Sequence, residues 1–453
     1  MALIIRKEIY GEHHSDVAES YNNLATLNSE LGQTWQAKKY HEKALTLNKK
    51  IYGEHHGYVA AGYYNLGIVY SDLCQYGDAK EYYEKSLTIK KEIYGEYHGD
   101  VAANYNSLGN ANLRLCQYRE AKICFERALV ITRKIYGGRN GPEVAKSYDS
   151  LGSVYRNICQ YSEAKEYHEK SLIIGKEIYG EHHGDVAASY NNLGIVCTDL
   201  GQYSQANDYH EKALTIGKKI YGEHHGDVAI SYNNLGNVYK ELGQYSLAKE
   251  NYEKALSIRR EIYGEHHGHV AQSHNNLGDV YIALSEYDQA KEHLEKGLAT
   301  RKKIYGEHHG DVAKSYYNLG RLYSDLGKCS EAKEHFEKTL TLCREIYGEH
   351  HGDVATIYSS LGDVYIKLSQ FNEAKQHLEM SLKLRKEIYG EHQKNHTKVA
   401  SSYFSLGTVY SKLGQYSQAK EYYEKALTIN KEIFGEHHED VAQISKTTWE
   451  MLT

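Results

Sequence analysis

The sequence predicts an all-α fold, a solenoid of stacked antiparallel helix pairs. Two observations support this prediction: a unit of about 42 residues recurs along the chain, and each copy contains two segments with helical periodicity. No segment shows the period of two that a half-buried β-strand requires. A recurring unit of this length is typical of a solenoid, in which each copy packs only against its neighbours.

A short tract, I-Y-G-E-H-H, marks each copy. Its aromatic residue stands at positions 10, 52, 94, 136, 179, 221, 263, 305, 347 and 389, and Phe434 is the last member. Successive positions differ by 42 residues except for one step of 43 and one of 45. The extra residues fall in turns, so the period of the helical segments is kept throughout.

Within one copy, the residue pattern predicts where each helix begins and ends. Residues 185–200 have apolar residues at helical spacing, with Asp185 as the expected N-cap and Gly201 just past the end. Residues 203–221 form the second expected helix, and Gly222 ends it because glycine readily adopts the left-handed conformation that closes a helix.

The same pattern predicts how the chain is organised. Residues 1–10 match the second helix of an incomplete leading copy, residues 11–439 form ten tandem copies of 42–45 residues, and residues 440–453 form a terminal capping helix. We therefore expect either a fragment of a longer protein or a solenoid whose start is poorly capped.

The composition excludes several classes of protein. The 453 residues carry 54 basic and 60 acidic side chains, a formal charge of −6, which argues against a nucleic-acid partner. Apolar runs reach only four or five residues, far short of a membrane span, so we expect no membrane insertion. Arg6 and Lys7 follow the first five residues and leave no apolar region of signal-peptide length, so we expect a cytoplasmic protein. The seven cysteines include no C-x-x-C pair, and Cys74, Cys116 and Cys159 recur at equivalent places in successive copies, too far apart for a disulfide.

One helix pair carries a family resemblance. It reads L-G-x-x-Y-x-x-L-G-x-Y-x-x-A-x-x-x-x-x-x-A-L and resembles the tetratricopeptide repeat at Leu235, Gly236, Tyr239, Leu242, Gly243, Tyr245, Ala248, Ala255 and Leu256. The 42-residue period and the G-x-x-H-x-D-V-A turn are similar to the kinesin light chain and nephrocystin class of these repeats. The resemblance covers essentially the whole chain. It implies a right-handed superhelical solenoid whose first helices line a concave groove.

The sequence predicts no catalytic or metal site. The histidine pairs of the G-E-H-H turns lie too far apart, from copy to copy, to share one metal ion, and we expect exposed, solvated turns. No P-loop, G-x-S-x-G or H-E-x-x-H motif occurs. The sequence therefore predicts a protein that is not an enzyme and that needs neither cofactor nor metal.

A ladder of asparagines in the first helices is the main candidate binding feature. Asparagine is a poor helix former, so its repeated presence indicates a compensating role. By the resemblance, the asparagine before each Leu points into the groove, where its amide can donate to and accept from a peptide backbone. The alternatives are a residue copied without function, or one that bonds the neighbouring copy. The candidate groove residues are Asn23, Asn65, Asn192, Asn234, Asn276 and Asn318, the preceding Asn191 and Asn233, and the variable Arg114, Arg156, Lys240 and Arg321.

These observations predict a protein-protein interaction scaffold that binds an extended peptide or partner protein in its concave groove, as an adaptor does. The alternative function is the regulatory or sensing region of a larger protein such as a nucleotide-binding ATPase. A third, weaker alternative is a structural spacer. The sequence names no partner and leaves the oligomeric state open, a monomer included.

Overall fold

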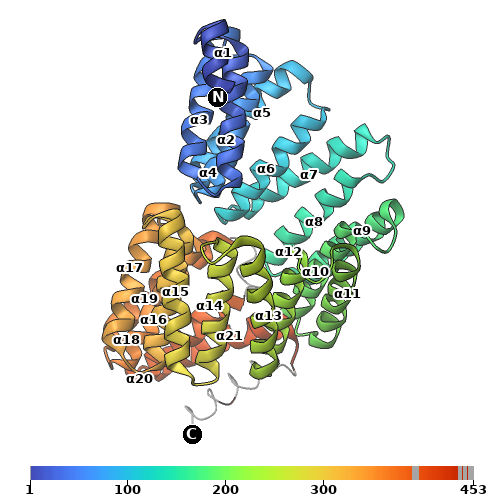
Figure 1. The fold of residues 1–453 in the computed structure, drawn as a ribbon. Helices are drawn as coiled ribbons and strands as arrows, with labels where there is room; N and C mark the ends of the chain where they lie inside the picture. The colour runs from blue at the N-terminus through green and yellow to red at the C-terminus, as the bar shows by residue number, and fades with distance from the viewer. Residues whose placement is uncertain (1, 390–396, 437–440, 442–445, 447–453) are drawn as a thin grey trace. The chain divides into compact units, whose positions relative to one another are not determined.

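The structure is a computed structural model that describes residues 2–389, 397–436, 441 and 446. Within these residues it contains 21 α-helices and no strand, so the predicted all-α class is confirmed (Figure 1). The leading helix is α1 (Ala2–Tyr10). The expected terminal helix, residues 440–453, lies outside the described residues apart from 441 and 446.

Ten helix pairs follow α1, each with a shorter first helix and a longer second helix. The first helices are α2 (Ser15–Glu30), α4 (Gly57–Asp72), α6 (Gly99–Arg114), α8 (Pro142–Asn157), α10 (Gly184–Asp199), α12 (Gly226–Glu241), α14 (Gly268–Ala283), α16 (Gly310–Asp325), α18 (Gly352–Lys367) and α20 (Thr397–Lys412). The second helices are α3 (Thr34–Tyr52), α5 (Tyr76–Tyr94), α7 (Tyr118–Ile135), α9 (Tyr161–Tyr179), α11 (Tyr203–Tyr221), α13 (Tyr245–Tyr263), α15 (Tyr287–Tyr305), α17 (Cys329–Tyr347), α19 (Phe371–Tyr389) and α21 (Tyr416–Phe434).

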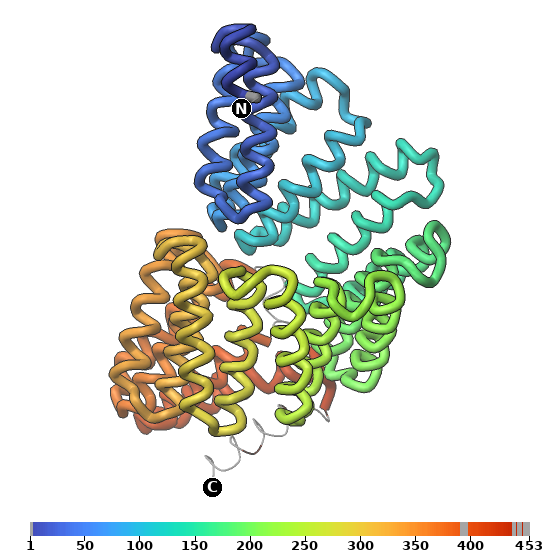
Figure 2. The backbone as a smooth tube through the Cα atoms, in the orientation of Figure 1, coloured from blue at the N-terminus to red at the C-terminus, as the bar shows by residue number. Residues whose placement is uncertain are grey.

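Within α1–α7 and within α10–α21, each helix packs against its neighbours in the chain, as a stack of antiparallel pairs requires. Figure 2 follows the backbone through these pairs and shows the two helices of each pair running in opposite directions. The helices divide into two compact units. The first unit comprises Met1–Val154 and Tyr167–Gly180, and the second comprises Tyr155–Glu166 and Glu181–Thr453.

Eight of the ten first helices begin at a histidine cap. The helix α10 starts at Gly184, and the side chain of His183 accepts a hydrogen bond from the backbone N–H of Asp185 at 3.2 Å. The expectation that Asp185 is the N-cap was therefore wrong: Asp185 lies in the first turn, where its charge suits the helix dipole. The Nδ1 atom of the histidine accepts from the backbone N–H two residues later, which has no partner within the helix. In other helices an Asp or Ser side chain satisfies such an N–H.

Left-handed residues end the helices, as expected. Gly201 follows α10 with a φ of 70°, and Gly222 follows α11 with a φ of 82°. Cys74, Cys116 and Cys159 occupy the place of Gly201 in their own copies, with φ values of 58–59°. These three cysteines therefore adopt a backbone conformation that normally favours glycine.

The core lies between the two helices of a pair and the first helix of the next. Leu193 and Leu235 are fully buried, as the pattern predicts. Gly236 lies directly under the ring of Tyr252, and a Cβ atom at Gly236 would come within 2.6 Å of that ring. The small residue of the first helix is therefore required by the large ring of the second. No helix in the described part of the chain is both long and apolar enough to cross a membrane.

Candidate functional site

A hollow of about 440 Å³ in the second unit brings several of the predicted groove residues together. The helices α10 and α12, neighbours in Figure 1, supply most of its lining. We call it the α10–α12 hollow and define it by Arg156, Ile195, Thr198, Asp199, Gly201, Tyr203, His210, Asn234, Asn237, Lys240, Glu241 and Phe434. Three of these, Arg156, Asn234 and Lys240, are residues that the sequence predicted for the groove.

Asn234 is the polar side chain of this hollow that lacks a partner. Its side chain is 8% exposed, and the structure records no hydrogen bond to it from any described residue. Its neighbour Asn237 is engaged, since its Oδ1 accepts a hydrogen bond of 2.6 Å from the hydroxyl of Tyr252. Burial raises the pKa of Tyr252, which keeps that hydroxyl protonated and able to donate. The amide of Asn234 therefore has free capacity both to donate and to accept.

The charges of the hollow compensate one another. Arg156 forms an ion pair with Asp199 of the next copy, and Lys240 lies 3.5 Å from the carboxylate of Glu241. Burial lowers the pKa of His210 to about 4, so its ring is neutral at neutral pH. A site with balanced charge and a free amide suits the uncharged N–H and C=O groups of a peptide backbone.

Other asparagines of the ladder already have partners. Asn276 donates through Nδ2 to Oδ1 of Asn233 in the preceding copy, at 2.7 Å. Asn191 donates to the hydroxyl of Ser231 at 3.2 Å and accepts from the ring of His210 at 2.8 Å. For Asn191, Asn233 and Asn276 the geometry favours the alternative that the ladder bonds neighbouring helices, and we leave these three out of the proposed contact site.

The remaining predicted residues are spread over both units. Asn23 and Asn65 lie on first helices of the first unit, and Arg114 donates there to the hydroxyl of Tyr76 at 3.2 Å. In the second unit, Arg321 pairs with Asp279 at 3.2 Å. Asn192 is half-buried and Asn318 is buried, and neither lines the α10–α12 hollow.

The sequence reasoning did not single out several residues of the hollow. Ile195, Thr198 and Asp199 come from α10, and Asn237 comes from α12. Asn237 lies three residues after Asn234, a spacing that places both on one face of a helix. That spacing was the available signal, and it was hidden because, apart from Asn110, the other complete copies carry residues other than Asn at the same place.

The histidine turns are built into the fold. The ring of His225 stacks on Tyr221 with 4.1 Å between centroids, and its Nδ1 caps the following helix. The other histidine of such a turn pairs outward, as His55 does with Glu92 at 2.7 Å. Among the described residues, no group of three His, Cys, Asp or Glu side chains is arranged to hold a metal ion.

Comparison with known families identifies the repeat. A model of the tetratricopeptide repeat matches residues 1–50, 36–92, 58–134, 100–172, 143–219, 200–261, 227–303, 269–342 and 311–387, and a second tetratricopeptide repeat model matches residues 400–432. The chain belongs to the tetratricopeptide repeat family. The predicted resemblance is thereby confirmed, and the family typically acts as a protein interaction scaffold.

Several solved structures are similar to this chain over part of its length. A Rap protein complexed with competence and sporulation factor superposes with a TM-score of 0.53 at 15% identity, over 82% of this chain and 99% of that one. BtubC (BKLC) from P. vanneervenii gives 0.41 at 23% identity, over 52% and 92%. Nearly identical TPR-like repeats from a Podosopora anserina protein assigned as a kinesin light chain give 0.38 at 25% identity, over 46% and 98%. No curated protein sequence matches the chain.

Proposed function

We propose that this protein is a non-catalytic, adaptor-like scaffold that binds an extended peptide segment of a partner protein along its first helices. The observation that carries the proposal is the free amide of Asn234, which is almost fully buried and faces the α10–α12 hollow without a hydrogen-bond partner. The polar atoms of this amide stay accessible from the hollow, since neither is among the fully buried unpaired side-chain atoms of the described residues. A hydrogen bond from the amide to a ligand contributes about 0.5–1.5 kcal/mol net.

The ligand class follows from the lining. The two cations and two anions of the hollow pair with each other, so a charged ligand would have to break existing ion pairs. The main-chain groups of an extended peptide need only one donor and one acceptor, and Asn234 supplies both. The apolar Ile195 and Tyr203 offer contacts for a side chain of the same peptide.

The test uses peptides selected from a random library against the whole chain. Replacement of Asn234 by Ala should weaken the selected peptide by about 1–3 kcal/mol and leave the melting temperature unchanged or slightly higher, because Ala is the better helix former. Replacement of Asn233, which bonds Asn276, should instead lower the melting temperature. If Asn234→Ala melts lower and binds the peptide as tightly as the native chain, Asn234 is a packing residue and the proposed site is wrong.

A further inference from the structure

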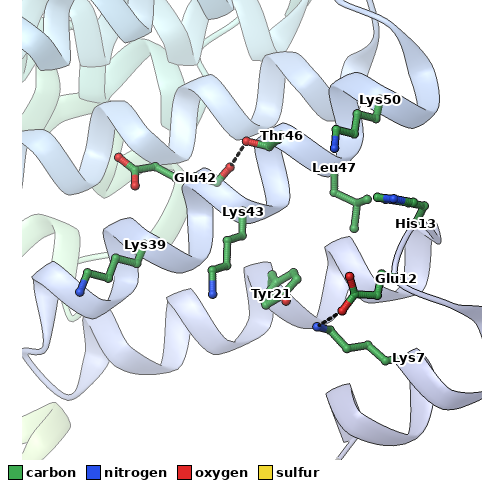
Figure 3. Close-up of a pocket in the computed structure, with 10 residues that line it drawn as sticks. All are labelled: Lys7, Glu12, His13, Tyr21, Lys39, Glu42, Lys43, Thr46, Leu47 and Lys50. Atoms are coloured by element: carbon green, nitrogen blue, oxygen red, sulfur yellow. Dashed lines mark hydrogen bonds and ion pairs between the residues drawn. The ribbon is translucent and has the colours of Figure 1, made fainter.

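A second hollow, of about 500 Å³, lies in the first unit among α1, α2 and α3. We call it the basic hollow and define it by Lys7, Glu12, His13, Tyr21, Lys39, Glu42, Lys43, Thr46, Leu47 and Lys50. Four lysines face two glutamates there, and one glutamate, Glu12, is already bonded to Lys7 at 3.1 Å. In Figure 3, Lys39 and Lys43 extend from the same helix, and Tyr21 lies close to Lys43.

Three of the lysines form a row on one helix. Lys39, Lys43 and Lys50 are separated by four and seven residues on α3, spacings that return to the same face of a helix. With a rise of about 1.5 Å per residue, the row extends for about 16 Å. A single phosphate cannot reach across that length. Side chains on one face of an extended peptide repeat about every 6.6 Å, so two or three carboxylates of one segment match the row.

The row lacks ion-pair partners among the described residues, whereas acidic residues replace two of its lysines in the next copy and form ion pairs there. In the next copy, Glu81 stands at the place of Lys39 and pairs with Lys85 at 2.5 Å. There Glu92 stands at the place of Lys50 and pairs with His55 at 2.7 Å.

The structure records no ion pair to Lys39, Lys43 or Lys50 from any described residue, and Lys43 only lies over the ring of Tyr21. Lysine recurs at the place of Lys50 in Lys134, Lys219 and Lys303. At the place of Lys39, the other nine complete copies carry Glu, Asp, Gln or Ile. The combination of Lys39 and Lys50 therefore occurs only in the first complete copy. It replaces residues that form ion pairs in the next copy and leaves this surface with excess positive charge.

We propose that the basic hollow binds an acidic peptide segment in an extended conformation, as a second contact site separate from the α10–α12 hollow. The lysines of α3 meet successive carboxylates, and Lys7, held by Glu12, packs against Tyr21 at one side of the row. The site lies entirely within the first unit and does not depend on the function proposed for Asn234. It would give a partner with an acidic segment a second point of attachment, which raises its overall affinity.

The experiment measures the binding of fluorescein-labelled hexaglutamate to the whole chain by anisotropy. The native chain should bind one peptide, more weakly as salt is raised. The double variant Lys39→Glu, Lys50→Glu installs the residues of the next copy, so folding should be kept, and binding should weaken about tenfold or more. The reciprocal variant Glu81→Lys, Glu92→Lys should create a second site and raise the stoichiometry.

The matched control changes the same charge elsewhere in the first unit. The variant Arg119→Glu, Lys146→Glu replaces two exposed basic residues outside the hollow and should bind hexaglutamate nearly as well as the native chain. Equal loss in both double variants would mean that only net charge matters, and would overturn the proposal. Inorganic pyrophosphate that displaces hexaglutamate at matched concentration would overturn the assignment to an extended peptide. Binding that survives in Asn234→Ala separates this site from the α10–α12 hollow.

Discussion

Asn191 and His210 share a hydrogen bond inside the second unit, with 2.8 Å between Asn191 Oδ1 and His210 Nδ1. The relationship recurs nineteen residues apart in other copies, between Asn22 and His41 at 3.0 Å and between Asp149 and His168 at 2.8 Å. At the same place other copies carry Tyr83, Phe125 or Tyr252. A histidine in this core position is thus accompanied by an oxygen acceptor on the first helix of its own pair.

The first prediction concerns this bond. Replacing Asn191 by Ala should destabilise the chain by about 1–3 kcal/mol, because the ring nitrogen of His210 is left buried without an acceptor. Urea unfolding followed by circular dichroism measures the loss. The adjacent Asn192, for which the structure records no hydrogen bond, is the matched control, and its replacement by Ala should change the midpoint little. Equal effects of the two variants would contradict a role for the bond.

The second prediction concerns pH. Burial lowers the pKa of His41, His210 and His274 to about 4, whereas an unfolded histidine titrates near 6.5. Between these values the unfolded chain binds protons that the folded chain does not, so stability is full above about pH 6.5 and falls as the pH approaches 4. Each ring should contribute about 2 kcal/mol of loss between pH 7 and pH 5.

Urea midpoints at a series of pH values measure this effect. The variant His210→Tyr removes one titrating ring and introduces the residue type found at the equivalent position, Tyr252, of the next copy. The pH dependence of the urea midpoint should therefore become weaker. A profile that keeps its full slope in His41→Tyr, His210→Tyr would show that other groups cause the acid sensitivity.

The third prediction concerns the close packing of helices. Replacing Gly236 by Ala would bring a Cβ atom within 2.6 Å of the buried ring of Tyr252, so the pair of helices must move apart. We expect a loss of about 1–3 kcal/mol, as for other overpacked cores. Gly99 begins a helix, and a Cβ atom added there would meet no other atom within 4 Å, so Gly99→Ala should be nearly neutral. Thermal melting compares the two, and equal melting temperatures would count against tight packing at Gly236.

The fourth prediction concerns the turn within a pair. Ser285 has a φ of 59°, in the left-handed region where other copies carry Gly201 or Gly243. A residue with a Cβ atom is disfavoured there by about 1–2 kcal/mol, so Ser285→Gly should raise the free energy of unfolding by about 1 kcal/mol. The opposite result is expected for Ser405→Gly within α20, since glycine weakens a helix interior. A decrease in stability for both variants would show that Ser285 makes a contact worth more than the strain it bears.

The sequence by itself determined the fold class and most helix ends. The helix α11 spans Tyr203–Tyr221, as the pattern predicts, because apolar periodicity and a following glycine act within one segment. The cap of α10 was misassigned because His183 and Asp185 are both within reach of the first turn, and only the folded backbone shows which side chain accepts the bond.

Only the tertiary structure decided which asparagines of the ladder are available to a partner. Asn233 and Asn234 are adjacent and of one type, yet Asn233 is bonded to Asn276 of the next copy and Asn234 faces a hollow without a partner. The excess charge of the basic hollow also depends on contacts between segments. His55 pairs with Glu92, which lies 37 residues later, whereas the residue 37 positions after His13 is Lys50. A repeating sequence states which residue types recur, but free hydrogen-bonding capacity and uncompensated charge belong to contacts between segments, and these exist only once neighbouring copies have packed.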